Sequence, residues 1–323
     1  MGTGRGTPPT DGRGWARVRV PATSANLGSG FDAVGVALGL VDEVAAQLRP
    51  DADEVVIDVR GEGEATVPRG SSHLIVRMIR RARDELGGPP SGIRLVARNR
   101  IPHSRGLGSS AAAIVAGLAL GHLLTRPGEP LDRPWLADLA SQVEGHPDNA
   151  AAAVYGGAVL AFTPPGTAGS PGPHTLVDRL EVHPDIGFAA FIPEHEVPTV
   201  DARQVLPDLV PRTDAVQQAI RSAMLVRALT VAPDRLLVAT EDFLHQRYRS
   251  SLMPASWRLV QFLRNRGVPA VVSGAGPTVL ALGPAALLSA LDDPALAGAW
   301  GGFRRVPLDL AGGVAVLDDA TLG

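Results

Sequence analysis

The chain has 323 residues, of which 45 % are apolar and 20 % charged, enough for about two globular domains with buried cores. All 30 basic residues are arginine and there is no cysteine, which excludes Schiff-base lysine, thiolate and disulfide chemistry. With a formal net charge of −3 the chain offers no basic surface for nucleic acid, and no apolar run reaches the roughly 20 residues of a membrane span.

The N-terminus, residues 1–14, is rich in Gly, Thr, Pro and Arg and has no apolar core segment. We therefore predict a disordered extension rather than a secretion signal, and a cytoplasmic protein that does not contact membranes.

From Trp15 onward, strand-like and helix-like segments alternate. Apolar alternation or short apolar runs predict strands over residues 15–20, 55–59, 93–97, 156–162, 187–192, 270–273 and 315–317. Helical spacing predicts helices over residues 71–86 (with Ser71 or Ser72 as N-cap), 109–124, 131–144, 213–230, 233–241, 256–266 and 284–291. A Pro/Gly/Ser/Thr segment at 164–173 predicts a joint, so we expect an α+β protein with domains over 15–165 and 166–323.

The most informative segment, residues 102–112, is a glycine-rich turn that runs into an alanine-rich helix. The first turn of a helix offers unpaired N–H groups and the positive end of a dipole, and glycines allow close approach to an anion. We expect a di- or triphosphate here, with serine hydroxyls donating to phosphate or ligating Mg²⁺. The common Gly-x-x-x-x-Gly-Lys-Ser/Thr loop is excluded because it needs lysine, and the glycines by themselves are equally typical of a plain capped helix.

Read in full, Pro-x-x-x-Gly-Leu-Gly-Ser-Ser-Ala-Ala resembles the ATP-binding motif of the GHMP kinases. Two further segments resemble that family in the expected order: residues 20–38, Val-Pro-Ala-Thr-Ser-Ala-Asn-Leu-Gly-Ser-Gly-Phe-Asp-Ala-Val-Gly-Val-Ala-Leu, and residues 272–279, Val-Ser-Gly-Ala-Gly-Pro-Thr-Val. The resemblance covers Trp15 to Leu317. It implies an N-terminal domain like ribosomal protein S5 domain 2, a ferredoxin-like C-terminal domain, and an active site between them.

The resemblance also implies the nucleotide and metal sites. ATP is expected to contact Pro102, His103, Ser104, Arg105, Gly106, Leu107, Gly108, Ser109, Ser110, Ala111, Ala112 and, from the helix over 71–86, His73. Relatives typically carry asparagine at the position of His73, which leaves its role toward the adenine open. Ser110 and Glu144 are the expected Mg²⁺ ligands, with Asp138 on the same helix as an alternative to Glu144.

On the substrate side, the resemblance implies that Arg203 and Arg249 clamp the carboxylate of an amino acid, because a planar guanidinium donates two parallel hydrogen bonds to it. Other expected substrate contacts are Asn26, Asp32, His146, Gly274 and Gly276. The implied reaction is ATP-dependent phosphorylation of L-homoserine to O-phospho-L-homoserine in threonine biosynthesis. His146 and Asn149 would orient the hydroxyl and the γ-phosphate, while Asp148 is either a base, a weak assistant or structural.

Three alternatives stay open from the sequence. The same fold acts on another amino alcohol, or it has become a non-catalytic metabolite sensor, or it is an ATP-dependent decarboxylase of the mevalonate branch. Intact Ser109, Ser110, Glu144 and Asn149 argue against the sensor, and the paired arginines argue against the decarboxylase. Because relatives are often dimers, a homodimer is a further expectation.

Overall fold

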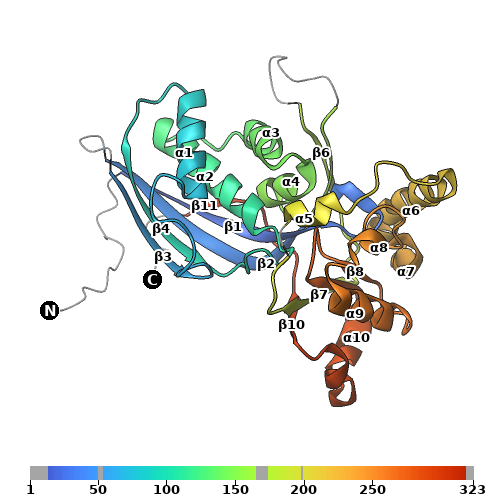
Figure 1. The fold of residues 1–323 in the computed structure, drawn as a ribbon. Helices are drawn as coiled ribbons and strands as arrows, with labels where there is room; N and C mark the ends of the chain where they lie inside the picture. Colours follow the sequence, from blue (N-terminus) through green and yellow to red (C-terminus); the bar gives the residue numbers. More distant parts are fainter. Residues whose placement is uncertain (1–13, 50–53, 165–173, 198, 318–323) are drawn as a thin grey trace.

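A computed structural model describes residues 14–49, 54–164, 174–197 and 199–317 of the chain (Figure 1). The predicted extension over 1–14 lies outside the described residues except for Gly14, as does the predicted joint over 164–173 except for Pro164. Among the described helices none combines the length and apolar character needed to cross a bilayer.

The larger of two sheets is built mainly from the N-terminal half. Its strands are β1 (Trp15–Asn26), β2 (Gly30–Arg49), β3 (Val55–Gly61), β4 (Gly92–Asn99), β5 (Ala158–Phe162), β6 (Leu176–Leu180) and β11 (Ala315–Val316). The strands are ordered β11-β1-β2-β4-β3 across the sheet. Strand β5 lies outside this order and pairs with residues 34–36 of β2 and with β6. Among the described strands only the β3–β4 pair is parallel, as expected for two strands joined by a crossover helix.

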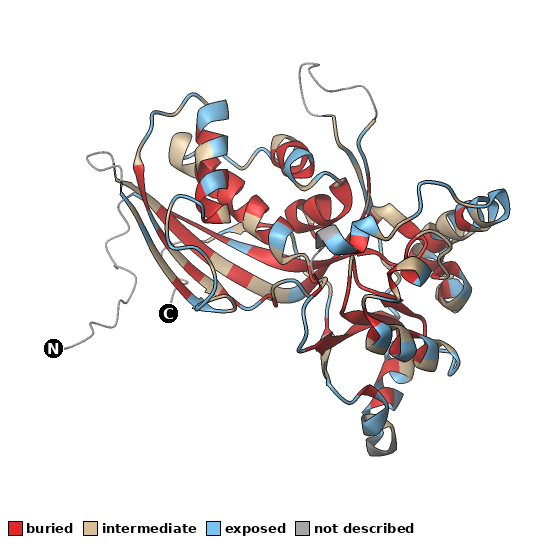
Figure 2. Ribbon diagram, in the orientation of Figure 1, coloured by how far each residue is buried: buried red, intermediate tan, exposed pale blue. Residues whose placement is uncertain are grey.

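The helices of the N-terminal half cover one face of this sheet (Figure 1). They are α1 (Leu74–Glu85), α2 (Ser109–Thr125), α3 (Arg133–Glu144) and α4 (Pro147–Tyr155). The buried residues in Figure 2 concentrate in α2, α4 and the centre of the sheet. Gly117 and Gly121 lie where α2 meets α1, since a methyl group on either would contact the backbone of α1. The alanine-rich sequence of α2 thus serves close helix packing.

The second sheet belongs to the C-terminal half. It contains β7 (Ile186–Pro193), β8 (Ala270–Val272), β9 (Val279–Pro284) and β10 (Phe303–Leu308), all antiparallel in the order β10-β7-β9-β8. This is the order of a ferredoxin-like sheet, as the resemblance implied. The accompanying helices are α5 (Thr199–Gln204), α6 (Arg212–Thr230), α7 (Leu236–Ala239), α8 (Gln246–Arg249), α9 (Pro254–Arg264) and α10 (Ala285–Ser289), and 3-10 turns span Pro233–Arg235, Ala290–Asp292 and Pro294–Trp300.

Several predicted elements need correction. Helix α1 begins at Leu74 with His73 at the N-cap position and no side-chain cap, so neither Ser71 nor Ser72 caps it. The 20-residue strand β2 was not predicted, because its glycines and acidic pair interrupt the apolar pattern. The short helix α4, and strands β6, β9 and β10, were also not predicted.

The two sheets do not divide at residue 165, because β6 and β11 follow that residue and yet belong to the first sheet. That residues 15–165 and 166–323 form separate domains stays a prediction.

Three glycine-rich segments meet where the two halves join. The backbone N–H of Gly274 donates to the carbonyl of Ala25 (3.1 Å), and Thr278 N–H donates to the carbonyl of Arg105 (3.2 Å). The hydroxyl of Ser273 donates to the carbonyl of Gly106 at 2.6 Å. The end of β1, the loop before α2 and the turn between β8 and β9 therefore form one continuous hydrogen-bonded junction.

A methyl group at Gly106 tests this junction. The residue has φ +74°, and an alanine Cβ would lie 2.7 Å from the carbonyl oxygen of Gly276 and closer still to that of Ser273. We expect Gly106→Ala to lower the free energy of unfolding by about 3 kcal/mol or more, from strain plus overpacking.

Gly128→Ala is the matched control, because its φ is +86° but nothing lies within 4 Å of the added Cβ. That variant should lose only about 1 to 2 kcal/mol in the same denaturation experiment. Equal losses in the two variants would contradict the proposed tight junction.

Candidate active site

The loop before α2 has the conformation that anion binding requires. Gly106 and Gly108 have φ of +74° and +66°, and Gly108 occupies the N-cap position of α2 without a side-chain cap. The first intrahelical bond is donated by Ala112 to the carbonyl of Gly108. The N–H groups of Ser109 and Ser110 therefore precede the first helical hydrogen bond and are available to an anion.

This loop opens onto a cavity of about 120 Å³ at the junction of the two halves. The predicted residues that line it are Asn26, Asp32, Ser104, Gly106, Gly108, Ser109, Ser110, Glu144, His146, Asp148, Asn149, Arg203, Arg249 and Gly274. They come from β1, β2, the loop before α2, the first turn of α2, the end of α3, the start of α4 with the residue before it, α5, α8 and the turn after β8. The fold thus gathers most of the predicted catalytic and substrate residues around one space.

A second, more apolar cavity of about 250 Å³ adjoins the first, because Ser104, Ser109 and Ser110 line both. Its polar walls include Asp42, His73, Asn99 and His103, and its apolar walls include Val44, Val67, Pro68, Leu74, Ile75, Ala112, Ala113 and Ala116. The ring of His73 is 5 % exposed, and its Nδ1 atom has no hydrogen-bond partner among the described residues. Burial lowers the pKa of His73, so the ring is a neutral polar group facing an apolar space.

Some predicted nucleotide residues, and the predicted substrate contact Gly276, lie in neither cavity. Leu107 and Ala111 are fully buried in the core. The guanidinium of Arg105 turns away from both cavities and donates to the carbonyls of Pro193 (3.0 Å) and Glu194 (2.7 Å). Pro102 lines a separate groove with Arg105, and Gly276 packs behind Gly106. These residues shape the loop and hold it against the second half of the chain.

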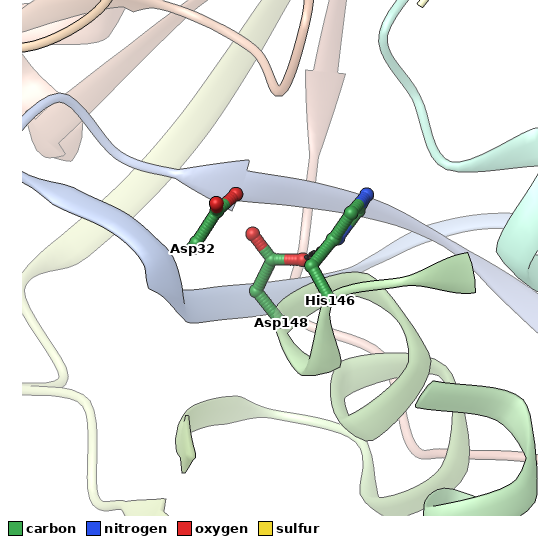
Figure 3. A group of neighbouring side chains, drawn as sticks. All are labelled: Asp32, His146 and Asp148. Carbon is green, nitrogen blue, oxygen red and sulfur yellow. Dashed lines mark hydrogen bonds and ion pairs between the residues drawn. The ribbon is translucent and has the colours of Figure 1, made fainter. Parts of the chain in front are cut away.

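Figure 3 shows a cluster of Asp32, His146 and Asp148, one potential ligand atom of each lying within 4.8 Å of the others. His146 precedes the first turn of α4 and its Nδ1 lies 2.6 Å from Oδ1 of Asp148. The same oxygen accepts from the backbone N–H of Asn149 at 2.7 Å. Burial disfavours charge on His146, but the hydrogen bond and the negative charge of Asp148 outweigh it and raise the pKa of the imidazole.

Two positive side chains face this cluster. Arg203 forms an ion pair with Asp32, with nitrogen–oxygen distances of 2.8 and 3.3 Å. Arg249 is only 2 % exposed and its guanidinium donates from Nε to the carbonyl of Ala202 (2.9 Å). Burial, reinforced by the like charge of Arg203, lowers the pKa of Arg249 to about 10, so the side chain remains charged at neutral pH.

The predicted metal residues also meet. The hydroxyl of Ser110 donates to Oε2 of Glu144 at 3.2 Å, across the start of α2 and the end of α3. Burial raises the pKa of Glu144 despite the nearby charge of His146. Asp138 instead binds the chain near β6: one oxygen accepts from His174 N–H (3.0 Å) and Thr175 N–H (2.9 Å), and it lines neither cavity.

Sequence reasoning missed Thr23 and His245. The hydroxyl of Thr23 donates to Oδ1 of Asn149 at 2.7 Å, which fixes the orientation of that amide. His245 is fully buried and lies 3.1 Å from Arg249. Thr23 lies within the N-terminal motif of residues 20–38, so the motif could have identified it. His245 contacts residue 28, which is far away in the sequence, and no local pattern indicates this contact.

Comparison with known proteins agrees with this geometry. The family model "GHMP kinases N terminal domain" matches residues 73–157, and "GHMP kinases C terminal" matches residues 225–294. A homoserine kinase of Cutibacterium acnes is 52 % identical over 87 % of this chain and 93 % of its own length. The chain belongs to the GHMP kinase family. A second relative, homoserine kinase of Streptomyces coelicolor, is 49 % identical over 92 % of this chain and 93 % of its own.

Solved structures of GHMP kinases share the whole architecture. A homoserine kinase from Cytophaga hutchinsonii is 25 % identical, with a TM-score of 0.77 over 98 % of this chain and 100 % of its own. A mevalonate diphosphate decarboxylase from Staphylococcus aureus is 16 % identical, with a TM-score of 0.69 over 94 % of this chain and 98 % of its own. That second likeness shows the fold alone.

The pKa of His146 is directly measurable. In ring-proton NMR of this GHMP kinase, we expect His146 to titrate above 6.5 and His122, whose pKa burial lowers, below 6.5. Because the folded-state pKa of His146 is raised, its contribution to stability is present below pH 6.5 and is lost as pH rises through the folded value.

Asp148→Asn should move the His146 titration down and leave that of His122 in place. An unmoved His146 titration in this variant would show that Asp148 is not the source of the shift.

Proposed function

We propose that this GHMP kinase transfers the γ-phosphoryl group of Mg·ATP to the side-chain hydroxyl of L-homoserine, giving ADP and O-phospho-L-homoserine. The observation that carries the proposal is that two guanidinium groups, Arg203 and Arg249, line the cavity beside the phosphate loop together with the carboxylate of Asp32. A zwitterionic amino acid matches this arrangement, whereas a neutral sugar matches neither charge. The names of the relatives support the same substrate.

The substrate carboxylate would bind Arg203 and Arg249, and the ammonium would bind Asp32 with the amide oxygen of Asn26. That amide already accepts from the backbone N–H of Asp32 and donates to the carbonyl of Gly274. The Asp32–Arg203 ion pair holds both groups in place before substrate arrives. Binding would then exchange one ion pair for two, with Arg203 turning to the carboxylate and Asp32 to the ammonium.

The nucleotide would place its phosphates on the backbone of Gly106, Gly108, Ser109 and Ser110 and its base in the adjoining apolar cavity. The two cavities share the serines, so a phosphate chain on the loop leads from one space to the other. The unpartnered Nδ1 of His73 is a suitable acceptor for an amino group of the base. No lysine is needed, because backbone N–H groups and the helix dipole stabilise the phosphates.

Magnesium would be held by Ser110 and Glu144. Both supply oxygen, and burial raises the pKa of Glu144, which a bound cation would lower. When bound, the ion neutralises charge on the phosphates. Glu144 is preferred to Asp138, since Asp138 is occupied by hydrogen bonds to the segment that begins β6.

For the chemical step, Asn149 and His146 would orient the acceptor hydroxyl against the γ-phosphate. A loose, metaphosphate-like transition state requires little proton removal at first, so positioning and charge stabilisation carry most of the rate. Oδ1 of Asp148 accepts from His146 and from the backbone of Asn149. We therefore assign Asp148 to positioning these two side chains rather than to base catalysis.

Three finer features stay proposals: a cytoplasmic location, a homodimer and homoserine as the preferred amino alcohol. A panel of hydroxy amino acids in a coupled ADP-release assay decides the last. Turnover of any member also rules out a silent sensor, and turnover of mevalonate diphosphate would instead favour the decarboxylase.

Arg203→Ala tests the carboxylate clamp. Loss of a charged bidentate contact should raise KM for homoserine at least about tenfold and leave KM for ATP within about twofold. Arg81→Ala is the control, because Arg81 pairs with Glu85 on the exposed face of α1 and should change neither value. Equal increases for both substrates in Arg203→Ala would remove Arg203 from the clamp.

Asp148→Asn tests for an essential base. If Asp148 positions its neighbours, kcat should fall by no more than about tenfold, because the amide keeps one acceptor oxygen. A loss beyond about a thousandfold in steady-state ADP release, with the fold intact by circular dichroism, would instead assign Asp148 as the base.

A further inference from the structure

His245 is a fully buried histidine beside the substrate cavity that none of the proposed steps uses. Its Nε2 lies 2.9 Å from the carbonyl oxygen of Gly28, and its Nδ1 lies 3.1 Å from Nη1 of Arg249. One face of the ring stacks on Phe31 with centroids 5.0 Å apart and 19° between planes. The ring therefore bridges the β1–β2 turn and the short helix α8.

The two partners fix the protonation state of the ring. A carbonyl oxygen only accepts, so Nε2 must carry the proton; a guanidinium only donates, so Nδ1 must be bare. His245 is thus neutral. Burial lowers its pKa and outweighs the charge of Asp242, whose Oδ1 lies 3.5 Å from Nε2, while Arg249 lowers it further and Asp32 opposes. A second proton on Nδ1 would face the guanidinium donor and break the contact.

A neutral imidazole leaves the positive charge of Arg249 uncompensated, because the other groups that accept hydrogen bonds from Arg249 are neutral as well. Its other hydrogen-bond acceptors among the described residues are the carbonyls of Ala202 (2.9 Å) and Gly274 (3.1 Å), which are also uncharged. No carboxylate of the described chain lies within ion-pair distance of this guanidinium. The side chain is therefore held in a fixed orientation while its positive charge stays available to the cavity. A carboxylate at position 245 would have held it equally well but neutralised it.

The same ring holds the other end of the substrate site. The turn that contains Gly28 separates Asn26 from Asp32, and it is also fixed by Ser29, whose hydroxyl donates to the carbonyl of Ala239 at 2.6 Å. Asp242 in turn fixes His245, since Oδ2 accepts from the backbone N–H of His245 (2.9 Å) and Gln246 (2.7 Å) at the start of α8.

We propose that His245 is a positioning residue for the amino-acid substrate: its neutral imidazole orients the guanidinium of Arg249 for the substrate carboxylate and ties it to the turn that carries the ammonium site. This inference rests on the proposed homoserine kinase function, but the proposed function does not depend on His245. The guanidinium carbon of Arg249 also lies 5.6 Å from the ring of Phe31, so histidine and arginine share one aromatic support.

His245→Phe is the direct test, because phenylalanine keeps an aromatic ring against Phe31 and removes both hydrogen bonds. We expect KM for homoserine to rise about tenfold or more while KM for ATP stays within about twofold. Titration calorimetry of homoserine into the enzyme loaded with a non-hydrolysable ATP analogue should show the same loss of affinity. His122→Phe is the matched control, since His122 is likewise buried but packs at a tilt against Trp135 and lines neither cavity, and it should leave both KM values unchanged.

A double variant separates positioning from a general packing effect. If His245 acts largely through Arg249, then His245→Phe should weaken homoserine binding clearly less in the Arg249→Ala background than in the wild-type enzyme. Multiplicative losses, equal increases in both KM values, or an unchanged His245→Phe would each overturn the proposal.

Should His245→Phe fail to fold, His245→Gln and His245→Met decide. Glutamine offers a donor and an acceptor and should keep KM for homoserine within about threefold, whereas methionine, of similar size, offers no donor and should raise it about tenfold. Equal values for these two variants would overturn the proposal. Wild-type ADP release on homoserine is measured first: its absence counts against the proposed function, whereas wild-type turnover with unchanged His245 variants counts against this inference alone.

Discussion

The site depends on one contact, the close approach of the loop before α2 to the turn after β8. Both backbones are within hydrogen-bonding distance there: Thr278 donates to Arg105, and Ser273 donates to the carbonyl of Gly106. Side chains at Gly106 would force the two apart. Because the loop holds the phosphate groups in our proposal and the turn contacts both the Asn26 amide and Arg249, this junction places nucleotide and acceptor within one cavity.

Charge in this cavity is arranged without lysine. The anion-binding groups are backbone amides, which have no pKa to shift and no side-chain entropy to lose. The fixed charges are two arginines of different character: Arg203 is 41 % exposed and already paired with Asp32, while Arg249 is buried and hydrogen-bonded only to neutral acceptors. Arg203 is therefore able to exchange Asp32 for the substrate carboxylate, whereas Arg249 supplies a positive charge in a fixed position. A chain whose basic residues are all arginine therefore lacks nothing that such a site needs.

The parts of this architecture that were predictable from sequence are those with a local signal. The phosphate loop is one continuous segment in which glycines allow a positive φ and the serines and alanines that follow begin a helix. The predicted start of α2 at Ser109 is confirmed. The family resemblance correctly predicted the ferredoxin-like sheet. Strand β2 was missed because its pattern depends on three different partners along 20 residues.

Long-range contacts explain the remaining misses. The role of His245 depends on a residue 217 positions away, and α1 begins at Leu74 without a capping side chain. Neither feature can be recognised from residues that are close to it in the sequence.

The measurement that tests this account most directly is a crystal structure of the enzyme with L-homoserine and a non-hydrolysable ATP analogue. We expect a substrate carboxylate bonded to Arg203 and Arg249, an ammonium on Asp32 in place of the present Arg203 ion pair, and a terminal phosphate on the backbone of Gly106 to Ser110. Homoserine bound away from both arginines, or bound with the Asp32–Arg203 pair intact and its carboxylate in solvent, would contradict it.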